Sequence, residues 1–187
     1  MTRVDYDRRL HQTYRAGRSL SADTGRLWMD ALAGHVGRAG ADLTILDLGA
    51  GTGLLARLFL EHGHRVIGVE PNEAMLSAGE RELARFTEYR AVRATAEETT
   101  LESASVDAAV AGQAFHWFDP DRTKLECIRI LRPNGLVALV WNTWHPATSD
   151  FMLGYASVVQ RFTSDHFENH HSGAKQQQNV ARFFEGR

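Results

Sequence analysis

The chain has 187 residues, of which 43% are hydrophobic and 24% are charged, and its formal net charge at pH 7 is −2. This length and composition can support one domain with a substantial buried core. The near balance of 21 basic and 23 acidic residues argues against nucleic acid or an anionic membrane surface as the partner.

No stretch of the sequence has the pattern of a targeting or membrane-spanning segment. The N-terminal stretch MTRVDYDRRLHQTYR is charged and lacks the apolar centre of a secretory signal, and no apolar run has the length of a membrane span. The lone cysteine, Cys127, excludes an intramolecular disulfide and is expected in a helix core in a reducing compartment. We therefore predict a cytoplasmic protein with no membrane or nucleic-acid partner.

Strand-length apolar runs alternate with helical patterns along the chain. A first amphipathic helix is expected over residues 21–37, with an apolar face of Leu27, Trp28, Leu32 and Val36, closed by Gly37 and Gly40. The expected strands are 43–48, 65–70, 88–92, 106–111 and 136–141. This alternation predicts an α/β fold, a Rossmann-like doubly wound and mostly parallel sheet with helices on both faces.

Three helices are expected to connect these strands. The first begins after the glycine-rich turn and ends near Gly63. The second begins at Pro71-Asn72, and the third begins at Asp119-Pro120 and ends at Pro133. Their expected inward residues are Leu54, Leu55, Leu58 and Phe59, then Ala74, Met75 and Ala78, then Leu125, Ile128 and Leu131. Two more helices are expected at 150–162 and near 180–184.

An acid and three alternating glycines follow the first strand of the predicted sheet. In ILDLGAGTGL, Asp47 precedes Gly49, Gly51 and Gly53. Glycine permits positive φ and lets the main chain approach a ligand closely at a helix N-terminus. The next strand ends in Glu70, and an acid in that place can accept both hydroxyls of a ribose. The two features together predict a site for a nucleoside-containing cofactor.

Two cofactor classes fit the glycine pattern. Gly51-x-Gly53-x-x-Ala56 also satisfies the dinucleotide fingerprint, so an NAD(P)-dependent oxidoreductase is the alternative interpretation. Asp47 favours a different cofactor, because a carboxylate in the turn would repel a pyrophosphate. S-adenosyl-L-methionine carries a sulfonium and an ammonium group and no phosphate, and it is the predicted cofactor.

Residues 43–142 resemble the core of the class I S-adenosylmethionine-dependent methyltransferases, in particular the methyltransferase type 11-like members. The family motifs occur in order as ILDLGAGTG, VIGVEPNEAML, ATAE and LRPNGL. The stretch QAFHWF is similar to that of a subgroup that methylates small carboxylic acids such as trans-aconitate. The resemblance implies in-line transfer of a methyl group to a small-molecule acceptor, with a carboxylic acid as one candidate.

The resemblance also assigns roles to residues of these motifs. The implied cofactor-binding residues are Asp47, Gly49, Ala50, Gly51, Gly53, Glu70, Pro71, Met75, Ala96, Glu97 and Gln113. Cofactor and acceptor should meet at Gln113–Phe118, where His116 is the candidate catalytic base, although a structural role for this histidine is equally open. A carboxylate acceptor needs no base, whereas a phenol, alcohol or amine must lose a proton.

A metal site is not expected in this chain. His166 and His170 are spaced four apart and His171 follows, but the stretch around them is polar and offers no acid at a spacing that would complete a closed site.

Three parts are expected along the chain. They are a helical segment at 1–40 that caps the cofactor site, the cofactor-binding core at 41–142, and a helical extension at 143–187. The family usually closes its sheet with strands six and seven, and nothing after Trp141 resembles them. We therefore expect these strands to be absent and the edge of strand 136–141 to pair in a homodimer. Their absence also leaves a catalytically impaired S-adenosylmethionine-binding protein as a third interpretation.

Overall fold

A computed structural model of the chain describes residues 22–36, 42–141, 149–151, 153–154, 157, 161 and 173–185. The chain divides into two compact units, Met1–Val140 and Trp141–Arg187.

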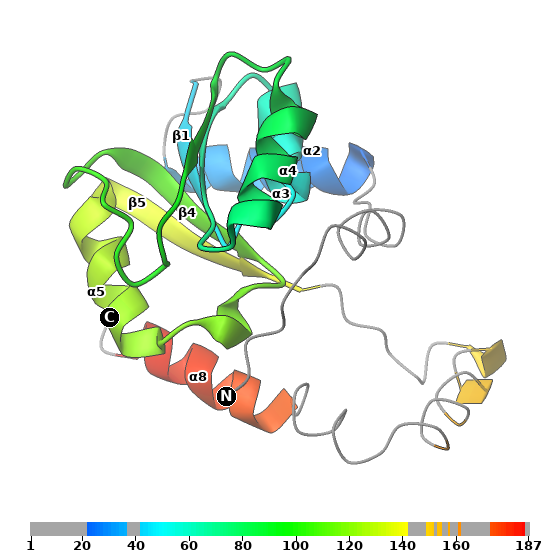
Figure 1. The fold of residues 1–187 in the computed structure, drawn as a ribbon. Helices are drawn as coiled ribbons and strands as arrows, with labels where there is room; N and C mark the ends of the chain where they lie inside the picture. The colour runs from blue at the N-terminus through cyan, green and yellow to red at the C-terminus, as the bar shows by residue number, and fades with distance from the viewer. Residues whose placement is uncertain are drawn as a thin grey trace. The chain divides into compact units, whose positions relative to one another are not determined.

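The first unit is built on a parallel sheet of five strands in the order β3-β2-β1-β4-β5 (Figure 1). Every neighbouring pair is parallel. The strands are β1 (Thr44–Leu48), β2 (Arg65–Val69), β3 (Tyr89–Val92), β4 (Val106–Gly112) and β5 (Leu131–Val140). The predicted α/β doubly wound fold is therefore confirmed.

Helices cover both faces of this sheet. The helices are α2 (Ala22–Val36), α3 (Leu54–Glu61), α4 (Glu73–Leu83) and α5 (Pro120–Ile130). The connections through α3 and α4 step toward β3, whereas the connection through α5 steps the other way, toward β5. Because such crossovers are right-handed, α5 lies on the face opposite to α3 and α4. This reversal next to β1 makes the carboxyl end of β1 the switch point of the sheet.

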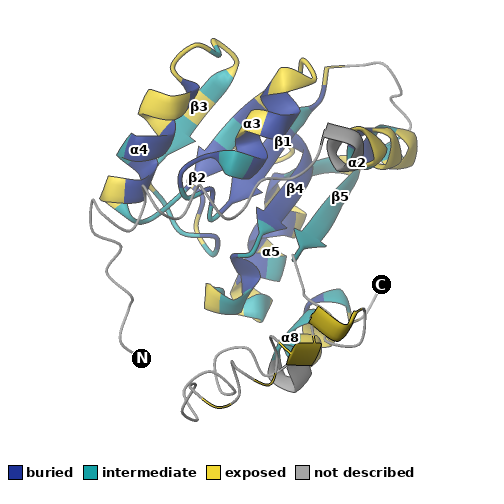
Figure 2. Ribbon diagram, turned by 90° about the vertical axis from the view of Figure 1, so that its right-hand side faces the viewer, coloured by how far each residue is buried: buried dark blue, intermediate teal, exposed yellow. Residues whose placement is uncertain are grey.

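The main core cluster lies between the sheet and the helices α2, α3 and α4. In Figure 2, β1 and β4 are buried along nearly their whole length, while β5 has intermediate exposure. The largest fully buried members of the cluster are Leu43, Ile45, Phe59, Val66 and Leu83. Apolar burial of this kind is the main stabilising contribution to the fold.

The buried face of α5 differs from the predicted one. Leu125 and Ile128 are 68% and 60% exposed, so their predicted inward placement was wrong. The helix also ends at Ile130, and Leu131 already begins β5, before the predicted stop at Pro133. The helix instead buries Thr123, Glu126, Cys127 and Ile130. Of these four residues only Cys127 was predicted to be buried, and nothing in the sequence pattern indicated that a glutamate would face the core.

Two further inward placements were wrong. Ala74 is exposed, because α4 turns Met75, Leu76, Ala78, Gly79 and Leu83 inward. Leu27 is 70% exposed, because Met29 and Leu32 form the buried face of α2. Both helices offer several neighbouring apolar stripes, and periodicity does not decide among stripes of similar strength.

Strand β5 is longer than predicted and lies at one edge of the described sheet. It begins at Leu131 rather than 136, and its register with β4 shifts between Val106↔Leu131 and Ala108↔Leu136. The extra residues form a bulge in which Asn134 has φ 64°. Among the described strands β5 pairs only with β4, which supports the premise of pairing through 136–141; the homodimer itself stays a prediction.

The second unit contains α8 (Gly173–Phe184), a longer helix than the one predicted near 180–184. Within it the rings of Phe183 and Phe184 meet edge to face at 5.0 Å. Most of the expected helix 150–162, the glycines Gly37 and Gly40, and His166, His170 and His171 lie outside the described residues. No helix in the described part of the chain combines the length and apolar character needed to cross a membrane.

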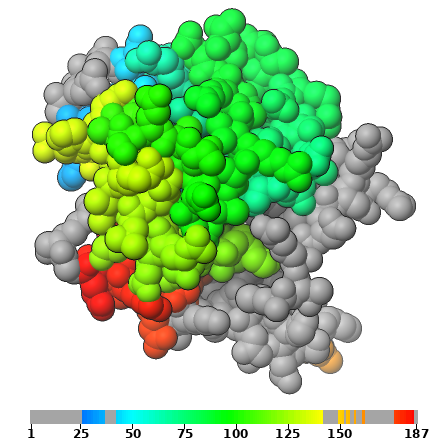
Figure 3. Space-filling model, turned by 60° about the vertical axis from the view of Figure 1, so that its left-hand side comes forward, coloured from blue at the N-terminus to red at the C-terminus, as the bar shows by residue number. Residues whose placement is uncertain are grey.

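A buried acid fastens α5 to the loop that follows β3. Glu126 accepts hydrogen bonds from the main-chain N–H of Thr99 at 2.8 Å and from Arg129 Nε and Nη2 at 2.8 and 2.7 Å. The bonds from Arg129 are the largest of the effects that lower the pKa of Glu126 to about 2. Figure 3 shows the same neighbours at the surface, where the green loop after β3 adjoins the yellow-green α5.

Replacing Glu126 by Gln should lower the free energy of unfolding at pH 7 by about 2 kcal/mol, because Arg129 and Thr99 lose a charged acceptor. The folded pKa lies below the unfolded value, so the contribution is complete above pH 4.5 and is lost as the pH falls toward about 2. Urea titrations at pH 7 and pH 3.5 measure this change. Glu73→Gln, in an exposed ion pair with Arg93, is the control and should change stability by less than about 0.5 kcal/mol. Equal effects of the two substitutions would contradict the assignment.

Candidate cofactor site

The glycine turn joins the end of β1 to α3 and is fastened to the end of β2. All three predicted glycines have positive φ, 69° at Gly49, 57° at Gly51 and 80° at Gly53. The N–H groups of Gly49 and Ala50 both donate to the Val69 carbonyl oxygen, at 2.8 and 3.1 Å. The turn is thus held across the switch point of the sheet.

The three glycines are required for different reasons. A Cβ on Gly49 would lie 2.6 Å from Ala114 Cβ, and one on Gly53 would lie 2.6 Å from Leu83 Cδ1. A Cβ on Gly51 would meet Met75 Cε at 3.4 Å and the Gly49 carbonyl oxygen at 4.0 Å. Gly49 and Gly53 therefore serve packing, whereas Gly51 is the one glycine of the turn where a Cβ would make only ordinary van der Waals contacts.

Glu70 follows β2 and is oriented by two main-chain donors. The N–H of Gly51 donates to its Oε2 at 3.0 Å, and the N–H of Asn72 donates to its Oε1 at 2.9 Å. Asn72 in turn caps α4 by accepting from the N–H groups of Ala74 and Met75. The two N–H donors hold the acid in one orientation, and a carboxylate oxygen can accept more than one hydrogen bond.

Asp47 lies beneath the turn and is almost fully buried. Its side chain is 1% exposed, and its Oδ2 has no hydrogen-bond partner. The pKa of Asp47 is raised to about 7, chiefly by burial and to a smaller extent by the charge of Glu70. A hydrogen bond from the main-chain N–H of Ala56 lowers the pKa and so opposes these two effects. A buried acid with one unpartnered oxygen is costly by itself and is suited to a cationic group of a ligand.

The predicted adenine-side residues lie at the same sheet edge. Met75 is buried beside Gly51, and Pro71 is half-buried after Glu70. Ala96 is buried in a short loop after β3. Glu97 has a structural contact, since its Oε1 accepts from the N–H of Asp119 at 2.9 Å. This bond ties the loop to the start of α5.

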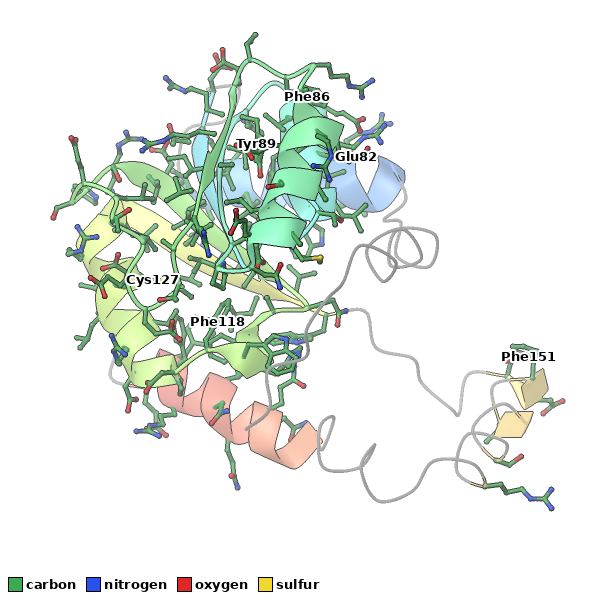
Figure 4. All side chains as sticks on the ribbon, in the orientation of Figure 1. Glu82, Phe86, Tyr89, Phe118, Cys127 and Phe151 are labelled. Atoms are coloured by element: carbon green, nitrogen blue, oxygen red, sulfur yellow. The ribbon has the colours of Figure 1, made fainter. Side chains whose placement is uncertain are left out.

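The segment after β4 packs directly on the glycine turn. Gln113 has φ 57°, an uncommon conformation for a residue other than glycine, and its N–H donates to the Val140 oxygen at 2.8 Å. The Phe118 ring comes within 3.4 Å of the position of a Gly49 Cβ and meets Phe115 edge to face at 5.9 Å. Figure 4 labels Phe118 in this region, between β4 and α5. A strained backbone at this place is typical of a functional site.

His116 lies in the 3₁₀ turn η1 (Phe115–Trp117). Its side chain is half-buried, and its ring centroid lies 4.8 Å from that of Trp117, which is 43% exposed. The histidine thus stands on the side of the turn that reaches solvent, while Phe115 is buried beneath it.

Two contacts of the site were missed in the sequence. Gly79 of α4 packs against the turn, since a Cβ there would lie 3.2 Å from the Gly51 oxygen and 3.4 Å from the Thr52 carbonyl carbon. Ala114 fits against Gly49 in the same close way. Gly79 stands four residues after Met75, on the same helix face, so the spacing carried a usable signal.

The switch-point turn, the acid after β2 and the parallel sheet define a nucleoside-cofactor fold of the class I methyltransferase type. The model of a methyltransferase-domain family matches residues 46–139. The chain belongs to this family of class I S-adenosylmethionine-dependent methyltransferases, as the sequence motifs predicted.

Several known proteins resemble the chain. An uncharacterized methyltransferase of Mycobacterium bovis is 46% identical over 99 residues, which cover 53% of this chain and 40% of the relative. A structure described as a proposed type II methyltransferase from Anaeromyxobacter dehalogenans has 30% identity and a TM-score of 0.60, covering 77% of this chain and 55% of that one. A proposed S-adenosyl-L-methionine-dependent methyltransferase from Methanococcus maripaludis has the same fold at 16% identity, with a TM-score of 0.65 and coverage of 98% and 84%. The matched region is thus about two fifths of the length of the mycobacterial relative.

Substitution of the glycines should separate packing from ligand contact. Gly51→Ala should cost about 1 kcal/mol of stability through its positive φ, yet weaken cofactor binding at least about tenfold, because the Cβ enters the ligand space. Gly49→Ala should destabilise the fold more strongly, since its Cβ overlaps Ala114. Thermal melts and calorimetric titrations of both variants measure the difference. A Gly51→Ala variant that binds normally would remove Gly51 from the site.

Asp47→Asn should stabilise the protein in the absence of a ligand. The unfolded carboxyl ionises near pH 3.8 and the folded one near pH 7, so a rise in pH between these values favours the unfolded state. The variant should therefore be more stable by about 2 to 4 kcal/mol at pH 8 and nearly unchanged at pH 4. Urea titrations across this range test the prediction. A stability difference that does not change with pH would contradict it.

Proposed function

We propose that the chain transfers a methyl group from S-adenosyl-L-methionine to a small-molecule acceptor, and that the acceptor is a carboxylic acid. The observation that carries the cofactor assignment is the buried acid of the glycine turn, with its unpartnered Oδ2 beside the oriented Glu70. Two acids at one edge suit a cation, and they would repel the pyrophosphate of a nicotinamide dinucleotide. Family membership supports the same choice.

The described residues fit this cofactor group by group. Glu70, fixed by two N–H donors, would accept the ribose hydroxyls, and Met75 would pack against the base beside Gly51. Asp47 would face the cationic methionyl part from beneath the turn. Pro71, Ala96 and Glu97 would border the adenine, with the remaining acceptor capacity of Glu97 directed to its amine.

The segment 113–118 would bring the acceptor to the reacting methyl group. When bound, the cofactor supplies an electrophilic methyl group on a sulfonium. Phe118 lies next to Gly49 and meets the buried Phe115 edge to face, so the two rings would help to exclude water there. An aromatic face near a sulfonium contributes about 0.5 to 2 kcal/mol. Alignment of acceptor, methyl and sulfur can supply about 7 to 11 kcal/mol, which makes positioning the main catalytic effect.

A carboxylic acid is favoured as acceptor because it is already a nucleophile at neutral pH. The resemblance of QAFHWF to methyltransferases of small carboxylic acids supports this class. His116, half-buried against Trp117, would then orient the acceptor and donate to its carboxylate rather than remove a proton. For a phenol or amine acceptor the same histidine would have to act as a general base.

Cofactor binding is tested by calorimetric titration with S-adenosylmethionine, S-adenosylhomocysteine and NADH. Glu70→Ala should weaken binding of both sulfur compounds at least about 30-fold, because it removes the charged acceptor of two hydroxyls. Glu73→Ala, three residues further along and in an exposed ion pair, is the matched control and should bind normally. Binding of NADH alone would overturn the proposal in favour of an oxidoreductase.

Methyl transfer is tested by release of S-adenosylhomocysteine with panels of carboxylic acids, phenols and amines. Turnover only with carboxylic acids, and less than about a tenfold loss in His116→Gln, would support the proposed acceptor class. Turnover with phenols or amines and a loss of 10²-fold or more in His116→Gln would assign the histidine as a base instead. Cofactor binding without turnover on any panel would favour the catalytically impaired binding protein.

A further inference from the structure

Tyr89 at the start of β3 reaches toward Asp47 through the gap left by a glycine. Tyr89 pairs with Val66 of β2, and Val66 pairs with Ile45 of β1. Two residues further along, Gly68 of β2 pairs with Asp47 of β1. Residues two apart on a strand share a face, so Tyr89, Gly68 and Asp47 lie on the same face of the sheet.

Gly68 leaves room for the tyrosine ring between β3 and β1. A Cβ on Gly68 would lie 2.5 Å from Tyr89 Oη and 3.1 Å from its Cε2. The hydroxyl therefore lies directly over the residue that separates it from Asp47. Figure 4 shows Tyr89 beside α4, at the strands of the sheet. The pKa of Tyr89 is raised by burial and then by the charge of Asp47, which is consistent with their proximity.

Tyr89 and Asp47 each have one buried polar atom that lacks a partner. Tyr89 Oη and Asp47 Oδ2 are buried and take part in no hydrogen bond, so they are not bonded to each other. One atom is a donor and the other is an acceptor, and a single buried water can join such a pair. A buried hydroxyl and a buried carboxyl oxygen are both costly to leave unpaired.

We propose that Tyr89 is a positioning residue for Asp47, whose ionised carboxylate accepts a hydrogen bond from the Tyr89 hydroxyl through one buried water. A donor aimed at the ionised form favours that form over the protonated one. Tyr89 thus sustains the negative charge that a cationic cofactor group requires. This inference rests on the proposed function for its purpose, but the hydrogen bond itself can be tested without any cofactor.

Other charged groups also act on this pair. Glu70, at the end of β2, raises the pKa of both Asp47 and Tyr89, and Glu80 of α4 raises that of Tyr89. From α3, the N–H of Ala56 favours ionised Asp47. Tyr89 and Ala56 are therefore the donors that oppose the effects of burial and of Glu70.

The test is a double-mutant cycle of Tyr89→Phe and Asp47→Asn, followed by thermal unfolding at pH 5 and pH 8.5 without cofactor. Tyr89→Phe keeps the ring over Gly68 and removes only the hydroxyl. It should lower Tm at pH 8.5, where Asp47 is ionised, and leave it nearly unchanged at pH 5. In the Asp47→Asn background its effect should be the same at both pH values. A pH-independent effect, or one that persists unchanged in the Asp47→Asn background, would overturn the proposal.

Cofactor affinity gives a second readout. In Tyr89→Phe the midpoint pH for S-adenosylmethionine binding should rise by about one unit, so that binding is about five- to tenfold weaker at pH 6.5 and within twofold of the parent at pH 9. Titration of the cofactor's own α-amino group is common to all variants and cancels in the comparison. Equal weakening at both pH values would show a merely structural role. If the parent chain binds no cofactor, the proposed function fails, while the unfolding experiment still decides the role of Tyr89.

Discussion

The rest of the structure depends on the hydrogen bonds between the glycine turn and the end of β2. The Val69 oxygen accepts from Gly49 and Ala50, while the Glu70 carboxylate accepts from Gly51. These bonds fix the end of β1 to the end of β2, start α3 in the correct direction, and orient the acid that follows β2. One set of hydrogen bonds from the main chain of the turn therefore supports both the fold and the orientation of Glu70.

Asp47 illustrates the conflict between stability and function within this site. Its carboxyl is 1% exposed and one oxygen has no partner, and this burial raises its pKa to about 7, so that the group is partly ionised at neutral pH. A neutral side chain would be more favourable for folding at this pH. The protein keeps an acid here although it also places Glu70 nearby. Retention of a costly charge is physically reasonable where a ligand supplies the opposite charge.

The errors in the sequence predictions concern helix faces and the ends of elements. Leu125, Ile128, Ala74 and Leu27 all lie in helices of the predicted type, yet each is on the exposed side. On α5 the buried side includes Glu126, which accepts a hydrogen bond from Thr99 and so binds the helix to a loop 27 residues earlier in the chain. Apolar periodicity contains no information about such a partner. The start of β5 at Leu131 likewise depends on pairing with Val106 rather than on local sequence.

The sequence by itself determined the sheet, the cofactor turn and the two acids, because strand alternation, glycine spacing and an acid at a strand end are local patterns with a direct physical meaning. Tertiary structure alone decided which glycines are closely packed and which has room for a Cβ, since Ala114, Leu83 and Met75 approach them from distant segments. It also decided that Tyr89 reaches Asp47 across Gly68, because the register of three strands brings these residues to one face. Local sequence fixes conformation and chemistry, but the distance between two side chains on different strands exists only once the strands have paired.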